Sequence, residues 1–205
     1  KFAGNLPRLL RPRKSWAPHI VPSRGNAVQP SSKRVCLADY VRAIPDFPKK
    51  GILFRDITPL LAAPIAFRQA IHELADRARD QKVDLVAAAE ARGFLFAAPL
   101  AMELGTGLIP IRKRGKLPYK TLSHTYDLEY GTDTLEIHAD AIPPGSRILV
   151  VDDLLATGGT VEACCQLVEK AGGQVVGCLF AIELKGLGGA ARVARYEPFS
   201  LIQYE

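Results

Sequence analysis

Two adjacent carboxylates, Asp152 and Asp153, stand shortly before a segment rich in glycine and threonine. They end an apolar run that is typical of a strand, and the residues after them turn into a predicted helix. A helix start offers unpaired backbone N–H groups and the positive end of the helix dipole, which favour a phosphate. A simple capped helix is the alternative for this segment alone. The residues that would hold the phosphate are Ala156, Thr157, Gly158, Gly159 and Thr160.

The two carboxylates need a ligand other than that phosphate. Two like charges about 4 Å apart repel each other by roughly 4 kcal/mol at an effective dielectric constant near 20. Ionised carboxylates accept hydrogen bonds, so Asp152 and Asp153 suit the vicinal hydroxyls of a sugar, or a cation. A ribose 5-phosphate is the simplest ligand with hydroxyls at one end and a phosphate at the other. The segment lacks the lysine of a Walker A loop and does not match the G-x-G-x-x-G pattern.

A group of cations follows two other apolar segments. Arg92 comes after the segment 83–89, and the run RKRGK at 112–116 follows the segment 107–111. Ligands of parallel sheets bind beyond the carboxyl ends of the strands, which share one edge. Cations there would clamp a second polyanionic group such as pyrophosphate, although a charge run on a loop is often only solvated. The candidates are Arg92, Arg112, Lys113 and Lys116.

Two further side chains could act on a flat base. Phe54, beside Arg55, offers a ring face for a heterocycle, and core packing is the alternative. Glu129 lies on the polar face of an alternating segment together with Asp127, because strand side chains alternate with period two. A carboxylate near a base could serve as general acid or base, and a solvent-facing glutamate is the alternative.

The elements that position these residues alternate along the chain. Apolar side chains at 64–80 follow i, i+3, i+4 and i+7, which predicts an amphipathic helix. Several predicted strands are apolar throughout, as in parallel sheets that helices cover on both faces. We therefore predict an α/β protein with a largely parallel twisted sheet flanked by helices. The predicted strands are 52–54, 83–89, 107–111, 147–151, 174–182 and 199–204; 112–120 is predicted to be a mobile loop, and 123–130 with 133–138 an antiparallel arm.

Composition narrows the class of protein. The net charge is +6, but residues 1–34 hold eight of the 27 basic residues and no acidic one, which leaves 19 basic against 21 acidic residues. We therefore predict a basic, proline-rich, flexible tail at 1–34, a single domain at 35–205, and no nucleic-acid partner. The four cysteines show no metal-binding spacing and favour a reducing, cytoplasmic location. No apolar run approaches the roughly 18 residues of a membrane span.

Longer motifs resemble one known family. The segments FRDITPLL, EARGFLFAAPLA, RKRGKLP, YDLEYGTDTLEIHADAI and VVDDLLATGGT occur in that order. Together they resemble the type I phosphoribosyltransferases, and among these the members that use adenine. The resemblance covers 35–205 and implies the fold of that family, with a small N-terminal hood beside the sheet and arm.

The resemblance also implies an activity and roles for residues. Adenine and 5-phosphoribosyl-1-pyrophosphate would give AMP and pyrophosphate, with Mg²⁺ bound mainly through the substrate, in a homodimer. The peptide between Glu90 and Ala91 would be cis. By motif, Asp152 and Asp153 would hold the ribose, residues 156–160 the 5-phosphate, and the four cations the pyrophosphate. Adenine would meet Leu53, Phe54, Arg55 and Leu184; Glu129 would handle a proton, with Tyr130 beside it on the mobile arm.

Other functions stay open at this point. Another base could replace adenine, because base recognition rests on the short segment LFRD. A non-catalytic sensor of phosphoribosyl pyrophosphate, with the basic tail on nucleic acid, is a second alternative. The complete cationic segment and Glu129 favour the enzyme. A transit peptide at 1–34 is disfavoured because five prolines oppose an amphipathic helix.

Overall fold

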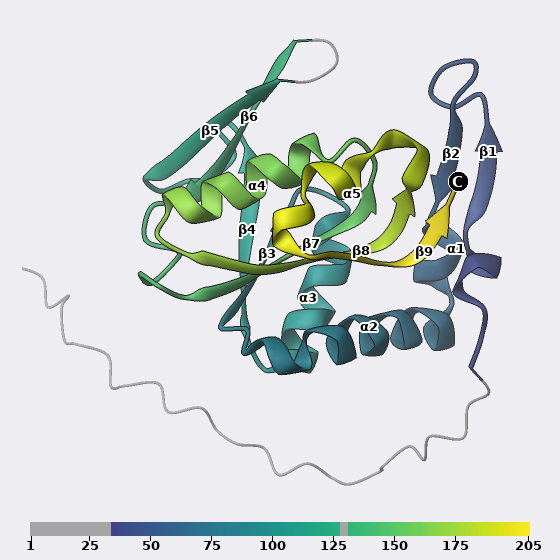
Figure 1. Cartoon of the computed structure of the whole chain (residues 1–205), viewed down its shortest axis with the longest axis horizontal. Helices are drawn as coiled ribbons and strands as arrows, with labels where there is room; N and C mark the ends of the chain where they lie inside the picture. The colour runs from purple at the N-terminus through teal and green to yellow at the C-terminus, as the bar shows by residue number, and fades with distance from the viewer. Residues whose placement is uncertain (1–33, 128–130) are drawn as a thin grey trace, which may run out of the picture. The chain divides into compact units, whose positions relative to one another are not determined.

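The computed structural model describes residues 34–127 and 131–205 and places a seven-stranded sheet at their centre (Figure 1). The strand order is β5-β6-β4-β3-β7-β8-β9. The five strands from β4 to β9 in this order pair in parallel, whereas β6 joins β4 and β5 in antiparallel fashion. The strands are β3 (Leu85–Ala89), β4 (Gly107–Lys113), β5 (Thr121–Asp127), β6 (Thr132–His138), β7 (Arg147–Leu155), β8 (Gln174–Leu184) and β9 (Pro198–Tyr204).

Helices cover both faces of this sheet. In the view of Figure 1, α4 lies above the sheet, and α2 and α3 lie below it. The crossovers between parallel strands require this arrangement, because each helix must pack back onto the sheet. The helices are α1 (Thr58–Ala62), α2 (Pro64–Ala78), α3 (Gly93–Leu104), α4 (Gly159–Lys170) and α5 (Gly189–Arg192), with 3₁₀ turns η1 (Leu37–Tyr40), η2 (Arg79–Gln81), η3 (Lys185–Leu187) and η4 (Ala194–Tyr196).

Strand β7 divides the core in two. Leu149 and Val151 pack with α2 and α3, whereas Ile148 and Val150 pack with α4. All four side chains are at most 1% exposed, so the strand is apolar on both faces. Beyond Val151 this alternation shifts phase, because Leu154 packs with the core of α2 and α3 and Leu155 with the core of α4. Asp152 and Asp153 lie at this shift, between the apolar part of β7 and its last two residues.

A separate hairpin precedes the sheet in the chain. Strands β1 (Arg42–Pro45) and β2 (Leu53–Asp56) pair only with each other, in antiparallel register. Phe47 and Phe54 pack edge to face inside it, with ring centroids 5.1 Å apart. This hairpin is the small hood that the family resemblance implies, and we call β1 and β2 with their connection the hood.

The fold predicted from the sequence is confirmed, with three differences in detail. Arg112 and Lys113 belong to β4 rather than to the predicted loop, because they pair with β6. For the same reason the predicted arm is an extension of the main sheet. Strand β7 also continues through Asp152 and Asp153 to Leu155. The tail predicted at 1–34 lies almost wholly outside the described residues, so the domain boundary stays a prediction.

The described residues contain no helix that combines the length and apolar character of a membrane span.

Replacing Leu74 by alanine is expected to lower the free energy of unfolding by about 2–5 kcal/mol. Leu74 is 0% exposed on α2 within the core shared with α3, so the change leaves a cavity that the packed core fills only in part. Arg68→Ala, on an exposed position of the same helix, is the matched control and should change stability by less than about 0.5 kcal/mol. Urea denaturation measures both, and equal effects would contradict the packing described here.

Candidate active site

A cavity of about 430 Å³ opens at the carboxyl ends of β3 and β7. The residues after β3 form one wall, and the end of β7 with the start of α4 forms the other. The cavity thus lies where open parallel sheets bind their ligands. It brings together all the residues predicted to hold a ribose 5-phosphate, together with one predicted pyrophosphate residue. The lining residues are Glu90, Ala91, Arg92, Asp152, Asp153, Leu154, Ala156, Thr157, Gly158, Gly159, Thr160 and Val161.

The predicted phosphate loop, residues 156–160, turns directly into α4. Gly158 has a φ of 80°, in the left-handed region that glycine adopts without strain. The helix begins at Gly159, so its first N–H groups face the cavity without intrahelical partners. The Tyr126 hydroxyl and the Thr160 hydroxyl lie 3.3 Å apart, which ties β5 to this loop. The loop, the helix start and the hydroxyls therefore lie together at the cavity, and the anion site itself stays a prediction.

The loop is packed tightly from behind by α5. A Cβ on Gly158 would lie 2.9 Å from the carbonyl oxygen of Gly189. A Cβ on Gly189 would collide with the carbonyl oxygen of Ala156 and lie 3.0 Å from the Gly158 nitrogen. Arg192 donates from Nε to Glu162 at 2.7 Å and so joins α5 to α4. The two backbones approach this closely because neither glycine carries a side chain.

The two carboxylates at the end of β7 have different environments. Asp153 is 6% exposed and forms an ion pair with Arg92, whose Nε lies 2.5 Å from Oδ2. Asp152 Oδ1 accepts the Asp153 backbone N–H at 2.8 Å, and a Cβ on Gly93 would lie 2.8 Å from the same oxygen. Burial, followed by the charge of Asp153, raises the pKa of Asp152 well above its ordinary value.

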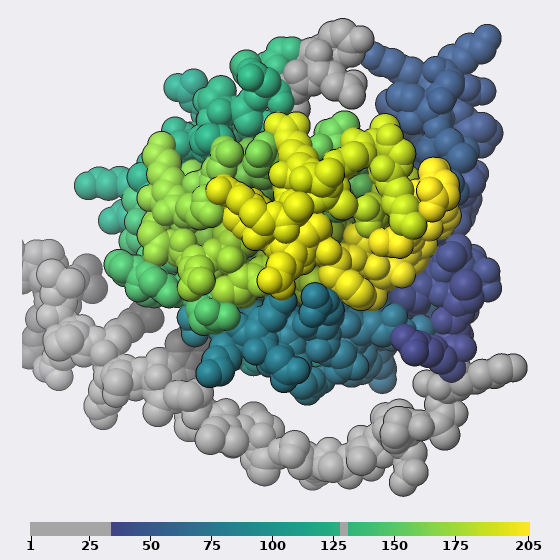
Figure 2. Space-filling view, viewed as in Figure 1, coloured from purple at the N-terminus to yellow at the C-terminus, as the bar shows by residue number. Residues whose placement is uncertain are grey.

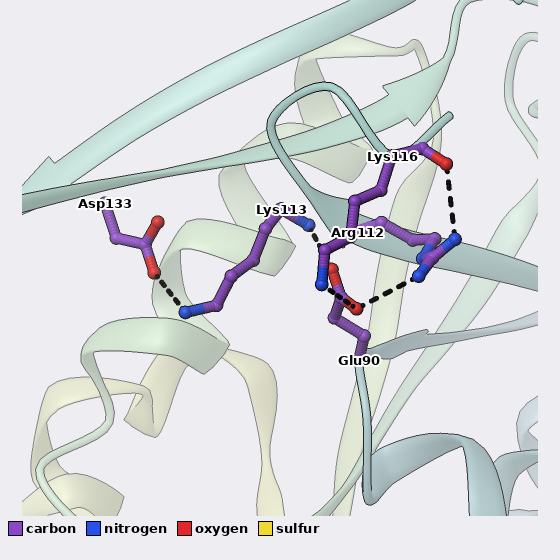
Figure 3. A network of polar contacts seen from close by, with 5 residues as sticks. All are labelled: Glu90, Arg112, Lys113, Lys116 and Asp133. Carbon is purple, nitrogen blue, oxygen red and sulfur yellow. Dashed lines mark hydrogen bonds and ion pairs between the residues drawn. The ribbon is translucent and has the colours of Figure 1, made fainter. Parts of the chain in front are cut away.

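Glu90 collects hydrogen bonds from the predicted pyrophosphate cations (Figure 3). Its carboxylate accepts from Lys116 Nζ at 2.9 Å, from Arg112 Nη2 at 3.2 Å and from the Lys113 backbone N–H at 2.7 Å. Burial alone would raise the pKa of Glu90, but these bonds outweigh it and lower the pKa to about 2. Glu90 is thus ionised at neutral pH and holds Arg112 and Lys116 side by side at the cavity edge.

The side chain of Lys113 points away from that cluster. Its Nζ forms an ion pair with Asp133 of β6 at 3.1 Å, whereas Arg112 and Lys116 reach Glu90 (Figure 3). The hydrogen bond and charge of Asp133 raise the pKa of Lys113. The structure therefore gathers Arg112 and Lys116 but not the ammonium group of Lys113, which the sequence had grouped with them.

The predicted base residues lie on the hood and on β8. The Phe54 ring centroid lies 5.7 Å from the Cζ of Arg92, which connects the hood to the ribose side of the cavity. The Arg55 guanidinium lies over the ring of Tyr204 on β9, with Cζ 3.6 Å from the centroid. Leu184 ends β8. Leu53 is 48% exposed, so its side chain adds little to any pocket in this state.

Two predicted residues, Glu129 and Tyr130, lie outside the described residues. The peptide between Glu90 and Ala91 is cis, as the family resemblance implies. Sequence reasoning missed the carboxylate of Glu90 as the partner of the cations, although Glu90 directly follows β3, at the edge where ligands were expected. It also missed Gly189, which no local pattern marks as a neighbour of the phosphate loop.

Comparison with known proteins agrees with this geometry. A family model described as the phosphoribosyl transferase domain matches residues 57–197. The adenine phosphoribosyltransferase of Rhodopirellula baltica is 59% identical over 168 residues, which cover 82% of this chain and 82% of that protein. That of Desulfitobacterium hafniense is 58% identical over 165 residues, which cover 80% of this chain and 95% of that protein.

Solved structures give the same result. The adenine phosphoribosyltransferase of Thermoanaerobacter pseudethanolicus superposes with a TM-score of 0.80 at 54% identity, covering 82% of this chain and 98% of that one. The Saccharomyces cerevisiae enzyme, solved with an imino-altritol bisphosphate and adenine, has a TM-score of 0.76 at 38% identity and covers 80% and 96% of the two chains. The chain therefore belongs to the phosphoribosyltransferase family and, within it, groups with the adenine phosphoribosyltransferases.

Proposed function

We propose that this chain transfers the 5-phosphoribosyl group from 5-phosphoribosyl-1-pyrophosphate to adenine, giving AMP and pyrophosphate in purine salvage. One observation carries the proposal. A single cavity is lined both by Asp153, which is paired with Arg92, and by residues 156–160 at the start of α4. Relatives that are 58% and 59% identical to this chain over the aligned residues carry the name of that activity.

The ribose 5-phosphate binds along the end of β7. Residues 156–160 hold the phosphate through their N–H groups and the hydroxyls of Thr157 and Thr160, and the helix dipole adds a favourable charge. Asp153, in its ion pair with Arg92, accepts from the ribose hydroxyls together with Asp152. The carboxylates also stabilise the positive charge that develops on the ribose ring as the leaving group departs.

Pyrophosphate, the leaving group, meets the cations at the other wall. Arg92, Arg112 and Lys116 offer their N–H groups there, and Lys113 reaches the group when it leaves Asp133. Glu90 holds Arg112 and Lys116 in place before the substrate arrives, so little reorganisation is needed during the reaction. This role for Glu90 is a positioning role.

Adenine binds between the hood and the end of β8. Phe54 stacks on the base, the backbone of Leu53 and Arg55 reads its edge, and Leu184 closes the pocket. Glu129 handles the proton that adenine loses, with Tyr130 beside it on the arm. Closure of the segment around 112–124 excludes water, which would otherwise hydrolyse the substrate.

Mg²⁺ fits the donor set of this cavity. Carboxylate oxygens such as those of Asp152 and Asp153 are the protein ligands it prefers, usually one or two beside substrate phosphates. Within 34–127 and 131–205, no group of three or more histidine, cysteine or acidic side chains could hold a metal alone. We therefore assign Mg²⁺ mainly to the substrate, where it supplies charge neutralisation of the pyrophosphate. We further propose a homodimer in the cytoplasm.

The activity is tested by incubating the purified chain with adenine, 5-phosphoribosyl-1-pyrophosphate and Mg²⁺. We expect stoichiometric AMP and pyrophosphate, loss of product when the metal is chelated, and little product from hypoxanthine, guanine or orotate. Chromatography of the nucleotides measures the result. Absence of AMP would refute the enzyme, and a preference for another base would refute the assignment of adenine.

Replacing Asp153 by asparagine is expected to raise the KM for the phosphoribosyl substrate by about 10- to 100-fold. The variant loses a charged acceptor and leaves Arg92 without its partner, and hydrogen bonds to charged groups contribute about 1.5–3 kcal/mol. Steady-state kinetics measure the change. Asp80→Asn, at an exposed position of η2, is the control and should keep the wild-type KM. An unchanged KM for Asp153→Asn would remove this residue from the ribose site.

Replacing Gly189 by alanine is expected to lower kcat/KM for the same substrate by about 10- to 100-fold. The new methyl group would collide with the Ala156 carbonyl, so the phosphate loop must shift. Gly186→Ala is the matched control, because a Cβ there meets no atom within 4 Å. Thermal unfolding of both variants separates a displaced loop from a lost fold. Equal kinetics for the two variants would contradict the packing role of Gly189.

A further inference from the structure

The aromatic ring of Tyr204 connects the hood to the last strand of the sheet. The Arg55 guanidinium carbon lies 3.6 Å from the ring centroid, within the range of a strong cation–π contact. Figure 2 shows the C-terminal residues, in yellow, lying against the blue hood. Burial raises the pKa of Tyr204 while Arg55 opposes the shift, so the phenol stays neutral and presents an intact ring face at neutral pH.

The hood has few other attachments to the sheet along its length. Its two strands pair only with each other, and an isolated two-stranded hairpin is marginally stable in water. The chain is anchored before it by Leu37, 7% exposed, and after it by Ile57, 5% exposed. Between these anchors, Arg55 on Tyr204 and Phe54 near Arg92 are the described aromatic–cation contacts that join β2 to the body.

The position of Tyr204 in the sheet relates its contact with Arg55 to the proposed base site. In the parallel register of β8 and β9, Tyr204 stands opposite Leu184. Leu184 and the backbone of Arg55 are both among the residues proposed to contact the base. Tyr204 is therefore the register neighbour of Leu184 in the sheet, and its ring contacts the guanidinium of Arg55. Tyr204 and Leu184 are both partly buried and pack against the same hydrophobic core.

We propose that Tyr204 is a positioning residue for base recognition, which fixes the hood strand β2 relative to the end of β8 through its contact with Arg55. The inference rests on the proposed function, since the base site is the adenine site proposed above. Tyr204 acts through Arg55 and sets the width of the pocket between the Arg55 backbone and Leu184. Binding of the phosphoribosyl substrate, at β7 and α4, does not depend on it.

The test separates the two substrates in steady-state kinetics. Tyr204→Leu is expected to raise the KM for adenine about two- to thirty-fold, the range set by one cation–π contact, and to leave the KM for 5-phosphoribosyl-1-pyrophosphate unchanged. Tyr204→Phe keeps the ring face and should retain the wild-type KM for adenine. A residue with a merely structural role would change both KM values together, or neither, in step with the unfolding temperature.

A matched control exists on the same strand. The Arg77 guanidinium lies 5.6 Å from the ring of Phe199, near the other end of β9 and away from the site. Arg77→Leu removes a contact of the same kind between a helix and β9, and both KM values should stay at the wild-type level.

A double-mutant cycle with Arg55→Met tests the partnership itself. If Tyr204 acts through Arg55, the variant carrying both Arg55→Met and Tyr204→Leu should show the same KM for adenine as either single variant. Additive effects, or an unchanged KM for adenine in Tyr204→Leu while the wild-type chain makes AMP, would overturn the positioning role alone. A wild-type chain that makes no AMP would overturn the proposed function and this inference together.

Discussion

The ion pair between Arg92 and Asp153 is the interaction on which the site depends. It lets one wall of the cavity carry a buried carboxylate close to residues 156–160, where we propose that phosphate binds. An unpaired buried charge would cost several kcal/mol, and the charge would be lost by protonation. Arg92 is the N-cap residue of α3. The packing of α3 in the core therefore also sets the distance between the Arg92 guanidinium and the Asp153 carboxylate. The same guanidinium lies near Phe54 and so links the sugar side of the cavity to the hood.

A carboxylate also pairs with cations on the other wall of the cavity. Glu90 keeps two cations together without cancelling them, because one carboxylate faces both Arg112 and Lys116. The cluster therefore retains a net positive charge, which suits the anionic leaving group that we propose. Asp133 on β6 instead pairs one to one with Lys113 on β4, so that pair carries no net charge. The site is thus a set of partly compensated charges, which lowers the cost of holding like charges close together.

Much of this could be predicted from the sequence because the signals were local. The period of α2, the apolar run of β7 and the glycine-threonine turn each depend on residues adjacent in the chain. The pairing of Arg112 and Lys113 with β6 could not be read in this way, since a charged segment gives no apolar pattern and its strand character comes from its partner. The raised pKa of Asp152 was equally inaccessible, because it arises from burial in the folded chain and from the charge of Asp153.

The close approach of Gly189 to residues 156–158 has a consequence for how such chains are recognised. The phosphate loop is defined by a short contiguous motif. Its shape also requires that Gly189, much later in the chain, has no side chain. A chain could carry the whole motif VVDDLLATGGT, with a bulky residue at position 189, and still lack a working loop. Motif and site are therefore separable, and a reliable assignment must include the small residue behind the loop as well as the loop itself.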